Sequence, residues 1–295
     1  MMRKIAFAVA LASGLMASPA IAQTAQPEAD SKVIITGRTP EDAVRDFVAE
    51  VGVAPNDANL ARWGDTVCVG VYNLTPQYAQ NLIDRVSLVG AAVGIEPGEP
   101  GCKPNVLIMA DQNSDELAAR LVQDHLRKFL PPATDDANLG RAALEKFKTS
   151  DAPVRWWQVS QTVLADTGEA VARGDTVRVR GSGRLRSNVR QDISHILIIL
   201  DTNRIGKISF ASLSDYVAMM ALAQIDADAD TREFPTILNL FASDASNRTM
   251  RLTQWDLDYL TALYETPGDA ANSGREANHI ARKMLQEQQS PAPAQ

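Results

Sequence analysis

Apolar and polar positions follow two different periods along this chain, and the period changes near residue 150. In the first half, apolar residues recur at helical spacing between two short, almost continuous apolar runs that are typical of buried strands. This pattern predicts the order helix, strand, helix, strand, helix, followed by one more helix. The helices are predicted at about 39–51, 76–94, 114–129 and 137–148, and the strands at 65–72 and 105–110.

The first of these helices has a clear start signal in Thr39-Pro40-Glu41-Asp42. A threonine hydroxyl caps free backbone N–H groups, proline suits the first turn, and acids there face the positive end of the helix dipole. Apolar residues then recur at helical spacing as far as Val51. We therefore predict that this helix begins directly after Thr39.

After residue 150 the apolar positions alternate with a period of two, which predicts antiparallel strands. Segments 155–165 and 175–186 should pair across a turn that contains Gly168, and the apolar run 192–200 should form a central strand. A further short edge strand is predicted at 32–36. The remaining pattern predicts helices at about 209–225, 234–241, 253–264 and 274–287.

The N-terminus has the pattern of a cleavable signal peptide. A short basic start and an apolar run over residues 5–17 precede the small residues Ala20 and Ala22. The run is shorter than the roughly 20 residues that span a bilayer, so a retained anchor is the weaker alternative. We expect cleavage near Ala22-Gln23 and a periplasmic or secreted mature chain without a transmembrane segment.

Charge narrows the range of partners. Loss of Arg3 and Lys4 with the signal peptide changes the formal net charge from −7 to −9. An acidic surface disfavours general binding to nucleic acid. A peptide, a protein or an anionic component of the cell envelope remains as a partner, and nucleic acid is not expected.

The chain contains two cysteines, Cys68 and Cys102. An even cysteine count in an exported protein favours a disulfide over free thiols. A metal site is the alternative, but it would need two more ligands and no histidine lies nearby in the sequence. We predict a Cys68–Cys102 disulfide.

Nucleophilic catalysis finds little support in the sequence. The chain has three histidines, His125, His195 and His279, and lacks a G-x-S-x-G motif. Ser194 and His195 are neighbours in a predicted strand, where successive side chains point to opposite faces. They should therefore not form a nucleophile–base pair, and no catalytic residue is assigned.

Two charged clusters suggest binding. One is basic and could form an anion-binding face, or a solvated face whose arginines pair with nearby acids. It consists of Arg178, Arg180, Arg184, Arg186 and Arg190.

The other cluster is acidic and places aspartates at positions 226, 228 and 230, as in the first half of a calcium-binding EF-hand loop. The pattern then fails, because Thr231 replaces the required glycine and Ile237 the bidentate glutamate. An acidic loop between helices is the simpler interpretation.

The C-terminal third resembles a known family. The strand at 192–200 is followed by SLSDYVAMMAL (212–222), FPTILNLF (234–241) and LTQWDLDYLTALY (252–264). This succession is similar to the catalytic half of exported bacterial zincin-type, metalloprotease-like proteins, and the whole chain resembles exported alphaproteobacterial proteins with the same helices. The resemblance implies an α+β fold with a zincin-like mixed sheet and packed helices, in a single domain of two lobes.

The chain departs from that family at the zinc-binding motif. In the H-E-x-x-H register, Ser214 replaces the first histidine, Asp215 the glutamate and Ala218 the second histidine. A catalytic zinc needs three protein ligands and a carboxylate base, which this helix does not supply. We therefore expect no metal, no cofactor and no zinc protease activity. Val217 and Met220 should pack in the core, and the former cleft is expected to be either lost or retained as a peptide-binding groove.

These observations predict a signal peptide at 1–22, a loose segment at 23–38, a zincin-like domain at 39–270 and a polar helix with a tail at 271–295. The two lobes are expected at about 39–150 and 151–270. Our preferred hypothesis is a non-catalytic binding or envelope-associated protein that uses the degenerate cleft or the arginine face. The alternative is a periplasmic hydrolase with an acid–base site built on Asp215, Asp256 and Asp258.

Overall fold

The structure is a computed structural model, and it describes most of the chain beyond the predicted leader. The predicted signal peptide, the strand at 32–36, Arg178 and Arg180 lie outside the described residues. The described ranges are 37–55, 58–64, 66–132, 138–172, 174–176, 184–244 and 248–289.

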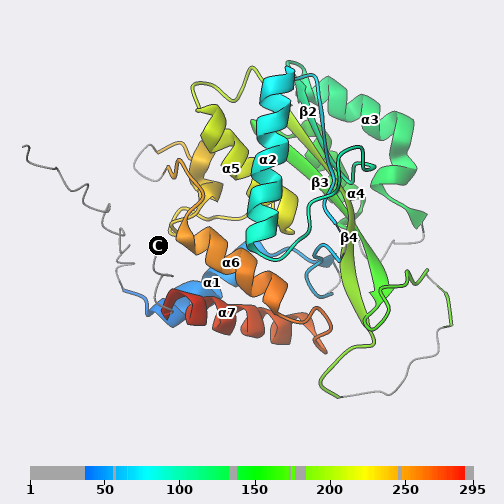
Figure 1. Cartoon of the computed structure of the whole chain (residues 1–295), viewed down its shortest axis with the longest axis vertical. Coiled ribbons are helices and arrows are strands. Elements are labelled where there is room, and N and C mark those ends of the chain that lie inside the picture. Colours follow the sequence, from blue (N-terminus) through cyan, green and yellow to red (C-terminus); the bar gives the residue numbers. More distant parts are fainter. Residues whose placement is uncertain are drawn as a thin grey trace, which may run out of the picture. The chain divides into compact units, whose positions relative to one another are not determined.

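A mixed four-stranded sheet forms the centre of the described fold (Figure 1). Its order is β1 (Val69–Tyr72), β2 (Val106–Asp111), β4 (Val189–Asp201) and β3 (Val154–Leu164). The first three strands run parallel, and β3 runs antiparallel to β4 at one edge. The sheet confirms the predicted α+β class with a mixed sheet, and strands from both predicted lobes pair within it.

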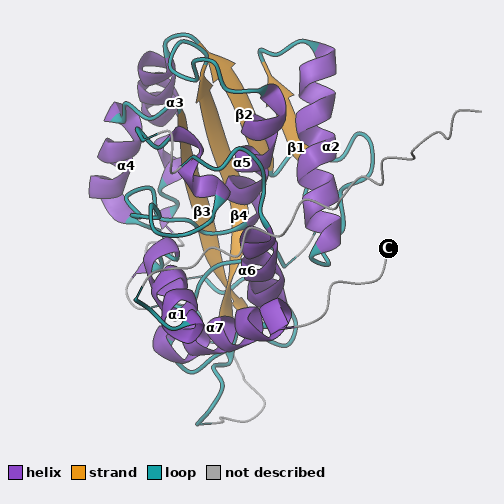
Figure 2. Cartoon of the chain, turned by 90° about the vertical axis from the view of Figure 1, so that its left-hand side faces the viewer, coloured by secondary structure: helices purple, strands orange, loops and turns teal. Residues whose placement is uncertain are grey.

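Helices cover both faces of the sheet and make three layers (Figure 2). One face carries α3 (Ser114–Phe129) and α4 (Gly140–Thr149), and the other carries α2 (Pro76–Ala92) and α5 (Phe210–Leu222). Three further helices pack into the same hydrophobic core as α2 and α5: α1 (Pro40–Val51), α6 (Gln254–Glu265) and α7 (Ser273–Gln289). None of the described helices combines the length and apolar character needed to cross a bilayer.

Local sequence signals explain where these elements begin. Thr39 caps α1 by accepting a hydrogen bond from the backbone N–H of Asp42, as predicted. The helix signals at 76–94, 114–129 and 253–264 are confirmed within a few residues. The segment 234–241 forms only a short 3₁₀ helix, η3 (Ile237–Phe241).

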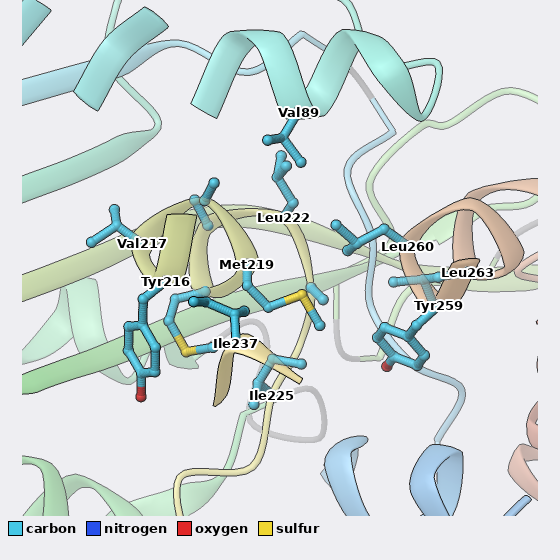
Figure 3. Close-up of a cluster of buried hydrophobic side chains, with 14 of the residues drawn as sticks. Val89, Tyr216, Val217, Met219, Leu222, Ile225, Ile237, Tyr259, Leu260 and Leu263 are labelled. Carbon is cyan, nitrogen blue, oxygen red and sulfur yellow. The ribbon is translucent and has the colours of Figure 1, made fainter. Parts of the chain in front are cut away.

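The larger core surrounds α5 (Figure 3). Every residue of this helix from Ser212 to Leu222 is buried, because α2, β4 and η3 pack around it. Met219 and Leu222 lie toward Val89 of α2 and Leu260 of α6 (Figure 3). The predicted core positions Val217 and Met220 are fully buried.

The strand pairing predicted after residue 150 lies partly outside the described residues, which lack 177–183 of the predicted strand 175–186. The predicted turn at Gly168 exists, with φ of 71°, and residues 169–171 after it are hydrogen-bonded to the end of β3 at 162–164. On its other side, β3 pairs over its whole length with β4, a pairing that alternating polarity alone does not specify.

Candidate functional site

The predicted disulfide joins Cys68, just before β1, to Cys102, in the loop before β2. Their Cα atoms are 6.1 Å apart, within the usual range for a disulfide. Gly98 lies against this bridge, and a Cβ atom there would come within 2.6 Å of the Cys102 sulfur. The bridge therefore fixes the loop that leads into the centre of the sheet.

The degenerate zinc-motif helix is α5, and its three motif positions are buried. Ser214 donates its hydroxyl to the carbonyl of Phe210, and Ala218 packs in the core. The side chain of Asp215 is 1% exposed and is bound by Arg85 and Arg251. A buried carboxylate requires such partners, since an unpaired charge in the core would be strongly destabilising.

No group of three or more histidine, cysteine, aspartate or glutamate side chains with metal-binding geometry occurs in the described part of the chain. The acidic loop after α5 is held by protein partners instead. Asp228 pairs with Lys146 at 2.5 Å, and Asp230 pairs with Arg232, which lowers the pKa of Asp230 to about 2.

The aspartates proposed for an acid–base site have separate structural partners. Asp256 accepts hydrogen bonds from Thr236 and from the backbone N–H of Ile237, and burial raises its pKa to about 6. Asp258 is bound by Gln254 at 2.7 Å, and burial raises its pKa as well. Neither aspartate shares a partner with Asp215.

The described members of the arginine cluster are largely neutralised by acids. Arg190 makes two contacts with Asp192, at 2.8 and 3.0 Å, and Arg186 lies 3.6 Å from Asp269. Arg184 is exposed. These pairs agree with the alternative interpretation of a solvated face paired with nearby acids.

A β-bulge changes the geometry of Ser194 and His195. Val159 pairs with His195 and Ser160 with Ile193, so Ser194 is left without a partner in the ladder. The Ser194 hydroxyl consequently lies 3.4 Å from Nδ1 of His195. The expectation that the two side chains point to opposite faces is therefore wrong, because strict alternation fails at a bulge.

One cleft among the described residues wraps around the edge strand β3, and we call it the β3 cleft. It encloses about 440 Å³ between α4 on one side of the strand and Tyr216 of α5, with the loop 225–228, on the other. Both sides are apolar and aromatic. The aromatic lining consists of Phe147, Trp156, Trp157 and Tyr216.

Buried hydrogen bonds hold the walls of the β3 cleft. Trp156 donates its indole N–H to the carbonyl of Ile225, and Gln158 donates to the carbonyl of Ala223 at 2.6 Å. On the other side, Arg155 donates to the last carbonyls of α4, at Phe147 and Lys148. The cleft is thus bounded by fixed elements on both faces of β3.

β3 lies at the edge of the described sheet, beside this cleft. Near its end, its outer side is bonded by Glu169, Ala170 and Val171 of the turn that follows it. An edge strand can offer backbone N–H and C=O groups to a further strand. The sequence contained a signal for this site, the adjacent tryptophans 156 and 157, but their opposite side-chain directions became informative only once β3 was known to be an edge.

One rim of the β3 cleft carries two acids and one base, which leaves an excess of one negative charge. Asp228 is paired with Lys146, and Asp226, which accepts the backbone N–H of Asp228, also attracts Lys146 through its charge. The mouth therefore favours a ligand that carries positive charge beside an apolar group.

A second, polar crevice of about 430 Å³ lies at the carboxyl ends of β2 and β4. Asp115 and Arg204 form a two-pronged ion pair there, which holds the pKa of Asp115 well below its usual range. The loops that border the crevice bind each other, as Asn203 donates to the carbonyl of Gln112. The polar groups that line this crevice are therefore bonded to one another.

Comparisons with protein-family models, curated proteins and solved structures find no match to this chain.

Proposed function

We propose that this chain is an exported, non-catalytic binding protein that takes an extended peptide along β3. The observation that carries the proposal is the β3 cleft, which surrounds a strand at the edge of the described sheet. An extended peptide can add a strand to such an edge, with main-chain hydrogen bonds giving affinity and side-chain pockets giving specificity.

The lining of the cleft defines the peptide. One large apolar side chain fits between the aromatic walls, and a neighbouring lysine or arginine would pair with Asp226 at the rim. The zincin resemblance supports the same location, since the cleft lies between the sheet edge and α5, the helix that aligns with the zinc helix.

Intrinsic fluorescence can test this proposal, because Trp156 and Trp157 line the cleft. We would titrate heptapeptides with a central phenylalanine followed by lysine, and matched peptides with alanine or glutamate at those positions. The phenylalanine–lysine peptide should bind, and the other two should bind at least tenfold more weakly. Absence of binding by all three peptides would contradict the proposal.

Two variants of α4 give a matched pair. Ala143 lines the cleft, whereas Ala142 on the same helix is exposed to solvent. Ala143→Trp should fill the cleft and weaken peptide binding at least tenfold, while Ala142→Trp should leave it unchanged. Equal affinities in the two variants would show that the peptide binds elsewhere.

The bulge in β4 favours one alternative, a serine hydrolase. Nε2 of His195 lies 2.9 Å from the carbonyl of Lys128, which can only accept, so Nδ1 is the unprotonated nitrogen that faces Ser194. Burial lowers the pKa of His195, which keeps the ring neutral and able to accept a proton. Labelling by a fluorophosphonate probe that is lost in Ser194→Ala would favour this function over peptide binding.

A further inference from the structure

One buried carboxylate of α5 binds two arginines, one from α2 and one from the segment before α6. Oδ1 of Asp215 accepts a hydrogen bond from Nε of Arg85 on α2. Oδ2 accepts from Nε of Arg251, at 2.7 Å, and from the backbone N–H of Leu252, at 2.9 Å. Both oxygens of the carboxylate are therefore occupied from within the protein.

Each arginine uses only one of its donor groups in this arrangement. Nε of each guanidinium points inward to Asp215, and the terminal Nη groups contact no other described residue. The side chains of Arg85 and Arg251 are 26% and 67% exposed, so these groups are accessible to solvent. A buried acid thus orients two guanidinium groups whose hydrogen-bonding edges remain free.

The local charge at Asp215 and its two arginines is positive, although the protein as a whole is acidic. Two guanidinium groups and one carboxylate leave one positive charge at this point, in a chain whose formal net charge is −7. Because the Nε donors of both arginines already bind Asp215, an anion would approach the outer, Nη side. Guanidinium groups bind phosphate oxygens through parallel N–H donors, which makes arginine well suited to such anions.

We propose that the Nη groups of Arg85 and Arg251 form a binding site for a phosphoryl group. The two oxygens of a carboxylate would leave several N–H donors of the two guanidinium groups unused. A phosphate monoester has three terminal oxygens and can accept more of these hydrogen bonds. The site is separate from the β3 cleft, and it does not depend on the proposed peptide binding.

Calorimetric titration with inorganic phosphate and pyrophosphate at constant ionic strength tests the free ligand, and sedimentation with phosphatidylcholine vesicles with and without phosphatidic acid tests a lipid headgroup. We expect binding in at least one arm. Binding only to phosphatidic acid vesicles would assign the phosphoryl group to a lipid. Failure of both arms would overturn the proposal.

Substitutions separate this site from general charge attraction. Arg251→Gln should weaken binding at least tenfold in the arm that binds. Arg45→Gln is the matched control, because Arg45 is 61% exposed and also pairs with one aspartate, on α1. Unchanged binding in Arg251→Gln, or an equal loss in Arg45→Gln, would refute a specific site. Thermal unfolding of both variants would verify that they remain folded.

Discussion

The buried pair of Arg62 and Glu276 connects the C-terminal helix to the body of the protein. Arg62 also donates to the carbonyl of Leu263 at the end of α6, and Glu276 accepts the backbone N–H of Leu60. Burial raises the pKa of Glu276 to about 7, although the positive charge of Arg62 opposes this shift. Protonation of this single side chain therefore influences how firmly α7 is held.

A carboxyl group whose pKa is higher in the folded than in the unfolded state binds its proton more tightly when folded. Its contribution to stability is complete at low pH and is lost as the pH rises through about 7. The free energy of unfolding of the parent, relative to Glu276→Gln, should therefore fall by about 2 kcal/mol between pH 5 and pH 8. Urea unfolding at both pH values measures this difference.

Glu265→Gln provides the control, because Glu265 is about half exposed and pairs with Lys283 of the same helix α7. Its stability relative to the parent should be the same at pH 5 and pH 8. A flat or rising difference for Glu276→Gln would show that the folded protein does not retain the proton.

At the scale of elements, Asp256 joins α6 to the 3₁₀ helix η3. It forms a capping box with Thr253 at the start of α6 and also accepts hydrogen bonds from Thr236 and Ile237. Its side chain is completely buried. One carboxylate thus satisfies donors from two elements that are separated in the chain.

Asp256→Ala should lower the free energy of unfolding by about 3 kcal/mol, since several buried donors would lose their acceptor. Asp84→Ala offers a comparison, because Asp84 accepts a bond from Gln80 on the exposed face of α2. That change should cost less than about 0.5 kcal/mol. Similar losses in the two variants, measured by denaturant unfolding, would contradict the role assigned to Asp256.

Elements whose signals are local were predicted well from the sequence. The cap at Thr39 and the apolar run in β4 depend on neighbouring residues, so the sequence contains what determines them. Pairing between elements is different. The bulge at Ser194 and the partners of Asp215, which come from α2 and from the segment before α6, depend on which surfaces meet in the folded chain.

The β3 cleft escaped prediction for the same reason. Its walls come from β3, α4 and the loop after α5, and none of these segments has an unusual pattern by itself. The resemblance to zincin-type proteins directed attention to α5, which lines the cleft through Tyr216, but it gave no sign of the edge strand β3.

At the scale of the whole molecule, the Cys68–Cys102 disulfide closes a long loop around β1 and α2. Such a cross-link reduces the conformational freedom of the unfolded chain, which stabilises the fold by about 3–4 kcal/mol in the loop-entropy model. Replacing both cysteines with serine should lower the free energy of unfolding by that amount.

Reduction of the parent protein should reproduce most of this loss, and reduction of the double variant should change nothing. Mass spectrometry under non-reducing conditions should detect the two linked peptides in protein purified from the periplasm. Two freely alkylated thiols in that material would contradict the bridge and weaken the proposal of export.

The order of the strands has a consequence for how a nascent chain matures. On one side, β2 pairs with β1, which is synthesised shortly before it. On the other side, it pairs with β4, where Val106 lies opposite Ile196, a residue synthesised much later. Until that much later segment has emerged, β2 presents an open edge that can pair with other chains. Sheets built from distant contacts also form slowly. A chaperone that shields the first half of the chain during synthesis or transport would therefore raise the yield of folded protein more than one that acts on the completed chain.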